Sequence, residues 1–184
     1  MESLKIGVIL SSTRKGRVSP QVGDWVMQLA KKYQDVDFSL IDINEFNLPF
    51  VETTDDMTQV HKFSDTINEL DGFIFVLAEY NHSMPPAIKN AIDSLKAPWY
   101  NKVAGIVSYG SSYGVRSAEH LRAVLTELRV ANVRTQVLLS LFDDFTNYIK
   151  FTPRNIHQVN FDEMMTQLIA WSKALKPIRK NISV

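Results

Sequence analysis

Three short stretches of this chain are apolar almost throughout: residues 4–10, 73–78 and 103–109. A strand with one face in water alternates polar and apolar residues, whereas a strand covered on both faces is apolar along its length. The three stretches therefore predict buried strands of a parallel sheet with helices on both sides. None is long enough to span a bilayer, which takes about 20 apolar residues as a helix.

Weaker signals supply the remaining elements. Residues 37–43 mix polar with apolar side chains, which is typical of an edge strand, and residues 133–141 form a fifth candidate strand. Apolar residues at three- and four-residue spacing predict helices between the strands. These helices are expected at residues 20–33, 57–70, 88–95, 118–128 and 161–175.

Two of the helices carry capping signals at their starts. Asp56 is followed three residues later by Gln59, and Asn160 is followed at the same spacing by Glu163. This spacing is that of a capping box, in which the two side chains bond reciprocally to the first turn. We expect Asp56 to cap the second helix and Asn160 to cap the last.

Strands and helices alternate from end to end, which predicts an α/β three-layer sandwich around a five-stranded parallel sheet. An edge position for the second strand favours the order 2-1-3-4-5. Ligands of such sheets bind beyond the carboxyl ends of the strands, beside the switch point between strands 1 and 3. The loops at residues 11–19, 79–84 and 109–116 are therefore the expected site, within a single domain of residues 1–184.

Composition excludes several classes of protein. The charge is balanced, with 20 basic and 20 acidic residues, so no basic surplus points to a nucleic acid. The absence of cysteine excludes disulfides and thiolate sites, and the four histidines show no metal-ligand spacing. Residues 1–5 lead straight into an apolar run without the pattern of a signal peptide. We expect a cytoplasmic protein with no metal and no membrane segment.

The first loop combines hydroxyl side chains with cations and ends at Ser19-Pro20. Serine is a favoured N-cap and proline suits the first helical position, so free N–H groups and a positive helix end would face the loop. Gly16 alone does not make a dinucleotide fingerprint, and the ending of a Walker loop is absent. The loop favours a terminal phosphomonoester such as that of FMN, while a polar loop with solvated charges stays an alternative.

The other two loops suit a flat ring better than a second phosphate. Residues 79–86 end in two prolines, which remove N–H donors from the next helix but make its entry rigid. Residues 108–116 contain glycines that allow close backbone approach and tyrosines that can cover a ring. Each loop read alone is an ordinary polar turn.

At these residues the chain resembles the NADPH-dependent FMN reductase family, which has the flavodoxin-like fold and includes quinone, chromate and azo-dye reductases. Residues 11–14 (Ser-Ser-Thr-Arg) look like its Gly-Ser-x-Arg loop, and residues 78–81 (Ala-Glu-Tyr-Asn) like its Pro-Glu-Tyr-Asn signature. Residues 113–116 (Tyr-Gly-Val-Arg) look like its Gly-Gly-x-Arg segment. Ser11, Ala78 and Tyr113 depart from the family pattern, and Tyr113 narrows the space above a bound ring.

The resemblance implies FMN as a tightly bound cofactor and NADPH or NADH as hydride donor. It implies ping-pong reduction of quinones, azo compounds, flavins or metal oxyanions, with the chemistry on FMN and no catalytic side chain. The phosphate would be held by the first loop and the ring by the other two. The residues implied are Ser12, Thr13, Arg14, Arg17, Val18, Ser19, Glu79, Tyr80, Asn81, His82, Tyr109, Gly110, Ser111 and Gly114.

The resemblance further implies a homodimer or a dimer of dimers with the flavin near the interface. Two other functions stay open at this point: an FMN electron carrier of the flavodoxin type, and a flavin-free regulatory domain on the same scaffold. The aromatic-rich stretch at residues 142–160 is long for a connection, and such length is typical of a lid, an interface or another functional segment.

Overall fold

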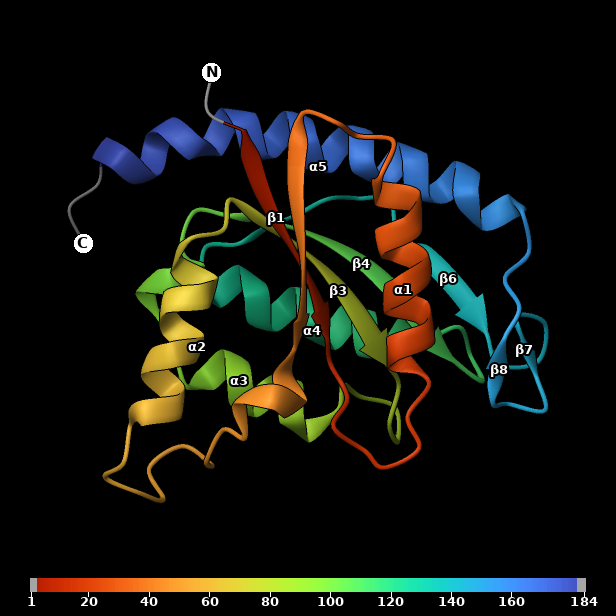
Figure 1. Cartoon of the computed structure of the whole chain (residues 1–184), viewed down its shortest axis with the longest axis horizontal. Coiled ribbons are helices and arrows are strands. Elements are labelled where there is room, and N and C mark those ends of the chain that lie inside the picture. The colour runs from red at the N-terminus through yellow and green to blue at the C-terminus, as the bar shows by residue number, and fades with distance from the viewer. Residues whose placement is uncertain (1–2, 182–184) are drawn as a thin grey trace.

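The main sheet is parallel throughout and has the strand order β2-β1-β3-β4-β5, with β6 also paired to β4 (Figure 1). The computed structural model describes residues 3–181. Its strands are β1 (Leu4–Leu10), β2 (Val36–Asp42), β3 (Gly72–Ala78), β4 (Val103–Gly110), β5 (Ala131–Asn132) and β6 (Val137–Ser140). The predicted order is confirmed, with the second strand at the edge. Residues 1 and 2, which belong to the stretch examined for a signal peptide, lie outside the described residues.

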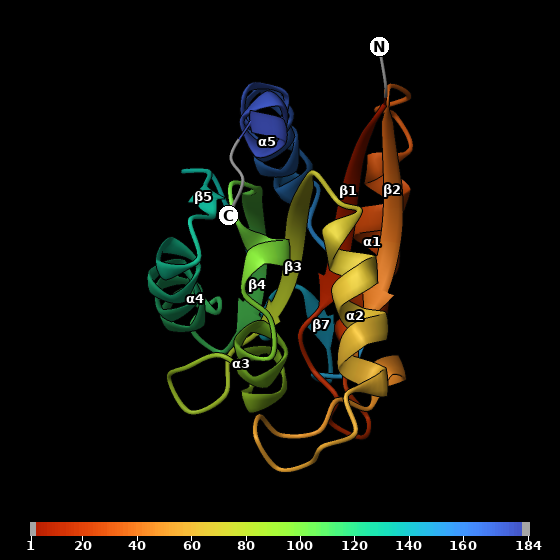
Figure 2. The same cartoon turned by 90° about the vertical axis from the view of Figure 1, so that its left-hand side faces the viewer.

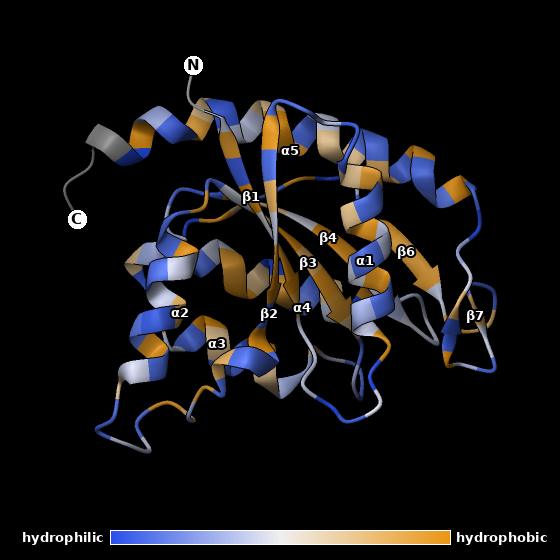
Figure 3. Ribbon diagram, viewed as in Figure 1, coloured by the Kyte–Doolittle hydropathy of each residue, from blue (hydrophilic) through white to orange (hydrophobic). Residues whose placement is uncertain are grey.

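Helices cover both faces of the sheet (Figures 1 and 2). One face packs against α1 (Ser19–Ala30) and α5 (Ile156–Asn181), and the other against α2 (Thr58–Asn68), α3 (Pro86–Asp93) and α4 (Val115–Glu127). Every residue of β3 and β4 is buried, as Figure 3 reflects in their mostly hydrophobic colouring. Two 3₁₀ turns, η1 (Ile43–Phe46) and η2 (Ala97–Trp99), and a small hairpin of β7 (Phe145–Thr146) and β8 (Lys150–Phe151) complete the fold. The three-layer prediction is confirmed.

The prediction of a single fifth strand over residues 133–141 is wrong, because two short strands, β5 and β6, stand in its place. Val103 pairs with Ala131 but Val107 pairs with Val137, so the outer strand carries extra residues between the two pairs. Side chains of the neighbouring helices form hydrogen bonds with polar groups of these extra residues. Arg122 on α4 donates to the carbonyl of Val133 at 2.8 Å, and further contacts from α5 hold Thr135. The strand is therefore interrupted between β5 and β6.

Both predicted capping boxes are wrong. The N-cap of α2 is Met57, without a side-chain cap, although Asp56 still accepts a bond from the N–H of Thr58 at 3.0 Å. Helix α5 begins at Ile156, so Asn160 lies inside it. The start of α5 is set by the buried Asp144, whose carboxylate binds residues just before and inside the first turn of the helix.

No helix within residues 3–181 combines the length and the hydropathy needed to cross a membrane.

A buried lysine, Lys102, lies at the edge of the sheet opposite the predicted site. Lys102 precedes β4, and its Nζ donates to the carbonyls of Ile67 and Asn68 at the end of α2, at 2.7 and 3.1 Å. Burial lowers the pKa of Lys102 to about 7, the charge of Arg179 adds to this, and Asp71 acts against it. A charged ammonium thus costs free energy here even though it satisfies two helix carbonyls.

This burial predicts how stability depends on pH. The folded protein releases the Lys102 proton near its lowered pKa of about 7, whereas the unfolded chain keeps it until about pH 10.4. The unfolded state binds more protons between these values, so the free energy of unfolding should rise with pH there, by at most about 1.4 kcal/mol per unit. Urea denaturation from about pH 7 to about pH 9.5 measures this slope. Lys102→Met should flatten the slope and Lys89→Met, on the surface, should not; equal slopes in all three proteins would contradict the assignment.

Candidate functional site

The three predicted loops meet at one edge of the sheet. The N–H of Ser11 donates to the carbonyl of Val76 at 3.1 Å, and the N–H of Ala78 donates to Ser11 Oγ at 3.2 Å. The N–H of Glu79 donates to the carbonyl of Tyr109 at 3.0 Å. The loops after β1, β3 and β4 are thus joined by hydrogen bonds where the strands end, as expected for a parallel sheet.

The first loop carries three cations, of which Arg14 and Lys15 are exposed and Arg17 is partly buried. Arg14 is exposed and its guanidinium lies 5.9 Å from the centre of the Tyr80 ring. Arg17 donates to the carbonyl of Ser12 at 2.8 Å and forms a half-buried ion pair with Asp42. Arg17 therefore braces the backbone of the loop, while Arg14 and Lys15 are exposed to solvent. The Ser12 hydroxyl bonds to the Tyr80 hydroxyl at 2.6 Å and ties this loop to the second.

Ser19 is not the N-cap that the sequence predicts. Helix α1 already includes Ser19, its N-cap is Val18, and no side chain caps it. The Ser19 hydroxyl is instead buried and makes no hydrogen bond of ordinary geometry within residues 3–181, although it lies near enough to the Tyr109 hydroxyl to act on the Tyr109 pKa. The first turn of α1 also holds no acidic side chain. A buried hydroxyl without a partner at a positive helix end fits an anion that would accept a hydrogen bond from it.

Tyr109 connects this hydroxyl to the third loop. Burial raises the pKa of Tyr109 above its ordinary value and Tyr80 adds to the rise, while Ser19, Arg17 and Arg14 act in the other direction. Tyr109 therefore stays protonated at neutral pH and can donate a hydrogen bond. Its ring packs against Phe145 with centroids 6.0 Å apart, which fixes the hydroxyl beside the first loop.

The second loop is a tight two-residue turn. Tyr80 and Ser83 exchange backbone hydrogen bonds of 2.8 and 2.9 Å, and Asn81 and His82 between them have φ of 47° and 68°. Positive φ at both central residues is the pattern of a type I′ turn. The two prolines follow as predicted, with Pro85 at the N-cap of α3. The turn thus presents an exposed Asn81-His82 tip on a rigid base.

The third loop is a turn built on one carbonyl. Gly110 O accepts bonds from the N–H groups of Tyr113 and Leu141, both at 3.1 Å. Ser108 Oγ donates to the carbonyl of Tyr113 at 2.8 Å, and Gly114, with φ of 71°, leads into α4. A side chain at Gly114 would meet the backbone of Tyr109 at 2.8 Å, so this close approach requires glycine. Ser111, at the tip, is exposed.

Two features of the site were missed at the sequence level. Glu79 is buried and its carboxylate is bound by Arg116 of α4, a residue quoted above only as part of a motif. The hairpin of β7 and β8 rests on the first turn of α1, where Gln21 bonds to the backbone of Ile149 at 2.8 Å and Phe151 at 2.9 Å. Neither contact follows from spacing, because each joins residues far apart in the chain.

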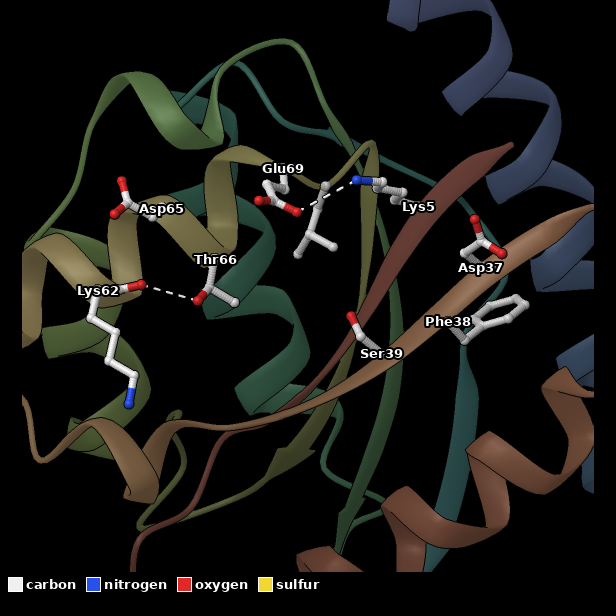
Figure 4. A pocket seen from close by; sticks show the side chains of 9 residues that line it. Lys5, Asp37, Phe38, Ser39, Lys62, Asp65, Thr66 and Glu69 are labelled. Carbon is white, nitrogen blue, oxygen red and sulfur yellow. Dashed lines mark hydrogen bonds and ion pairs between the residues drawn. The ribbon is translucent and has the colours of Figure 1, made fainter. Parts of the chain in front are cut away.

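One of the cavities within residues 3–181 adjoins these loops. A cavity of about 310 Å³ lies beside Thr13, between η1 and the start of α3, lined partly by Asn44, Asn47 and Phe50. A larger one, about 500 Å³, lies between β2 and α2 (Figure 4). The larger cavity contains charged groups such as the Lys5–Glu69 pair but none of the residues predicted to hold FMN. Within residues 3–181 no cluster of histidines and carboxylates has the makings of a metal site.

Comparison with known proteins decides the family. Residues 4–144 match the model of a family described as NADPH-dependent FMN reductase. The chain belongs to this family. It is 29% identical over 145 residues to an NAD(P)H-dependent FMN reductase of Saccharomyces cerevisiae, covering 69% of this chain and 76% of the yeast protein. It is 32% identical over 136 residues to a 2-hydroxy-1,4-benzoquinone reductase of a Burkholderia species, covering 70% and 73% of the two chains.

A solved structure supports the fold. FerB, a flavoenzyme NAD(P)H:(acceptor) oxidoreductase from Paracoccus denitrificans, superposes with a TM-score of 0.72, covering 94% of this chain and 98% of FerB. At 18% identity this likeness concerns the fold alone. The predicted flavodoxin-like sandwich of this FMN reductase is confirmed.

The buried Ser19 hydroxyl leads to predictions for both FMN affinity and the stability of the apo-protein. Ser19→Ala should weaken FMN binding by about 1.5–3 kcal/mol, the usual worth of a hydrogen bond to a charged group. The same change should leave the apo-protein equally or more stable, because an unsatisfied buried hydroxyl is removed. Calorimetric titration with FMN and urea denaturation of the apo-protein measure the two effects.

Ser172 offers a matched control, since its hydroxyl is also buried without a partner but lies against Gly72 at the far edge of the sheet. Ser172→Ala should share the effect on stability and leave FMN affinity unchanged. Equal FMN affinity of Ser19→Ala and the unmodified protein would remove Ser19 from the phosphate site.

Proposed function

We propose that the protein is an FMN-dependent NAD(P)H oxidoreductase that holds FMN across its three loops. The observation that carries this proposal is the buried, unpartnered Ser19 hydroxyl at the start of α1, beside the exposed Arg14 and the protonated Tyr109. This set of donors matches a phosphomonoester. Membership of the FMN reductase family identifies the compound that carries it.

The residues predicted from the sequence have distinct parts in this proposal. Ser12, Thr13, Arg14, Val18 and Ser19 would surround the phosphate, with Arg17 bracing the loop through Asp42. The tip of the second loop and the turn of the third would border opposite edges of the ring. The residues concerned are Glu79, Tyr80, Asn81, His82, Tyr109, Gly110, Ser111 and Gly114.

Bound FMN supplies the hydride chemistry: it accepts a hydride from NADPH or NADH and passes electrons to an acceptor. The protein's part is to hold the phosphate, fix the ring edge and leave one ring face open. The rigid turn of Asn81 and His82 suits this positioning role, because its backbone is already in place before a ligand arrives. Donor and acceptor would use the same open face in turn, which is ping-pong order, and no side chain needs to act as acid or base.

We also propose that the chain forms one domain over residues 1–184 and works in the cytoplasm as a homodimer or homotetramer, without nucleic acid. Exposed apolar side chains such as Phe50, which is 67% exposed beside the cavity at Thr13, support association with a second copy. Light scattering should give two or four times the 21.0 kDa of one chain. A monomer at micromolar concentration would contradict this part of the proposal.

The acceptor side of the site is best supported for planar aromatic compounds such as quinones. Phe142 and Tyr148 are 63% and 59% exposed and pack edge to face with ring centres 5.9 Å apart. They lie on the segment that Gly110 and Gln21 join to the third loop and to α1. Exposed aromatic pairs on a fixed support are typical of a binding surface. For the stretch predicted as a lid, an interface or another functional segment, we therefore propose that Phe142 and Tyr148, called the aromatic wall below, would border the flavin ring.

The reaction itself is tested by anaerobic mixing. The FMN-loaded protein should lose its flavin absorbance within seconds after addition of NADPH or NADH and regain it when a benzoquinone is added. Initial rates with varied donor and quinone should give parallel double-reciprocal lines. A flavin that stays oxidised for minutes with both nucleotides would favour an electron carrier and contradict the reductase.

The aromatic wall predicts a selective change in quinone kinetics. Phe142→Ala and Tyr148→Ala should raise the quinone KM about 5- to 30-fold, the effect of losing about 1–2 kcal/mol of ring contact, with FMN affinity unchanged. Trp171→Ala, which removes an exposed ring on α5, should change nothing. If the wall variants keep the quinone KM but lose oligomer mass, the pair serves association instead and this assignment is wrong.

A further inference from the structure

Arg116, in the first turn of α4, reaches across to the second loop. Its Nε donates to Glu79 Oε1 at 2.7 Å, its backbone N–H donates to Glu79 Oε2 at 3.2 Å, and its Nη2 pairs with the same carboxylate. Its Nη1 lies 3.0 Å from His82 Nε2. One side chain of the third loop's helix therefore holds the second loop at its base, Glu79, and at its tip, His82.

The burial of the two partners shows what this contact is for. The Glu79 side chain is 5% exposed and that of Arg116 is 35% exposed. Burying a carboxylate this far from water costs free energy unless charged partners and hydrogen bonds compensate for the lost solvation. Arg116 supplies both: its Nε and Nη2 converge on Oε1, its backbone N–H binds Oε2, and a lysine ammonium could not replace these guanidinium contacts together with the one to His82.

The turn that Arg116 holds is strained. Asn81 and His82 are both left-handed, a conformation that costs residues other than glycine free energy unless their surroundings impose it. His120, four residues after Arg116 and on the same side of α4, adds a second support through a contact of 2.9 Å between its Nδ1 and Ser83 Oγ. Helix α4 thus holds the turn from outside at two points.

We propose that Arg116 is a positioning residue for the flavin ring, acting through Glu79 and His82 rather than by contact with FMN. This rests on the proposed function. A guanidinium only donates hydrogen bonds, so His82 Nε2 accepts and the ring proton sits on Nδ1, turned away from Arg116. Arg116 also balances the charge of Glu79 beside the site. It therefore fixes both the shape of the turn and the electrostatic potential that the flavin experiences.

The charge balance gives the proposal a test with opposite signs. Arg116→Ala leaves the Glu79 carboxylate uncompensated, which disfavours added electrons, so the flavin midpoint potential should become more negative. Glu79→Gln leaves Arg116 uncompensated, and the potential should become more positive. The double variant should return close to the unmodified value. Spectroelectrochemical titration of the FMN-loaded proteins measures all four potentials.

FMN affinity provides the second readout. Arg116→Ala and Glu79→Gln should each weaken FMN about 10- to 100-fold, because each breaks a charge-assisted bond that holds the turn. The double variant should be no weaker than the worse single variant, since both act through one contact. Arg116→Lys should recover little of the loss, because a single ammonium group cannot contact both Glu79 and His82 as the guanidinium does.

A matched control lies on the same helix. Arg122 is also a partly buried arginine, but it binds the backbone before β6 rather than the site, so Arg122→Lys should leave potential and FMN affinity unchanged. Shifts of the same sign in both single variants, or fold-losses that multiply in the double variant, would overturn the role of Arg116. Failure of the unmodified protein to bind FMN would instead overturn the proposed function, so the two failures are distinguishable.

Discussion

The burial of β3 between β1 and β4 is the constraint on which the rest of the structure depends. Every side chain of β3 is shielded by helices on both faces, so its backbone groups must bond to neighbouring strands in one register. That register pairs Leu10 with Val76 and Ala78 with Tyr109, which brings the three strands to the same edge. The loops that follow have no freedom to separate. The site is therefore a consequence of core packing.

At that edge the molecule keeps features that do not favour folding. The Ser19 hydroxyl is buried without a partner, and Asn81, His82 and Tyr113 adopt left-handed backbone conformations. Residues in such conformations cost about 1–3 kcal/mol each when the structure imposes them. Contacts around the turns, such as the Arg116–Glu79 pair beside Asn81 and His82, hold the backbone in these conformations. A ligand that accepts a hydrogen bond from Ser19 and packs on the two fixed loops would gain from this arrangement, because the binding geometry exists before the ligand arrives.

The sequence predicts the fold well because its strongest signals are local. Continuous apolar runs mark β1, β3 and β4, the mixed pattern of β2 marks an edge, and the rule for parallel sheets then places the loops. The errors come from contacts between distant residues. The fifth strand is interrupted where the Val133 carbonyl binds Arg122, and α5 begins beside Asp144 rather than at Asn160.

The candidate site is divided in the same way. The sequence alone shows which residue types the site contains and in which order, and these led to the FMN reductase family that the comparison confirms. The burial and the bonding partners of these residues could not be predicted from the sequence. Ser19 is a buried hydroxyl rather than the predicted helix cap, Arg17 also pairs with Asp42, and Glu79 pairs with Arg116. Each difference depends on where a side chain from another element ends, and no local pattern records that.

The central claim is that these three loops form one FMN site, and titration of the apo-protein with FMN tests it most directly. The account predicts saturable, one-to-one quenching or shifting of flavin fluorescence and absorbance, with a dissociation constant that rises in Ser19→Ala and not in Ser172→Ala. Free-flavin spectra at every protein concentration would contradict it, and so would binding that both serine variants retain unchanged.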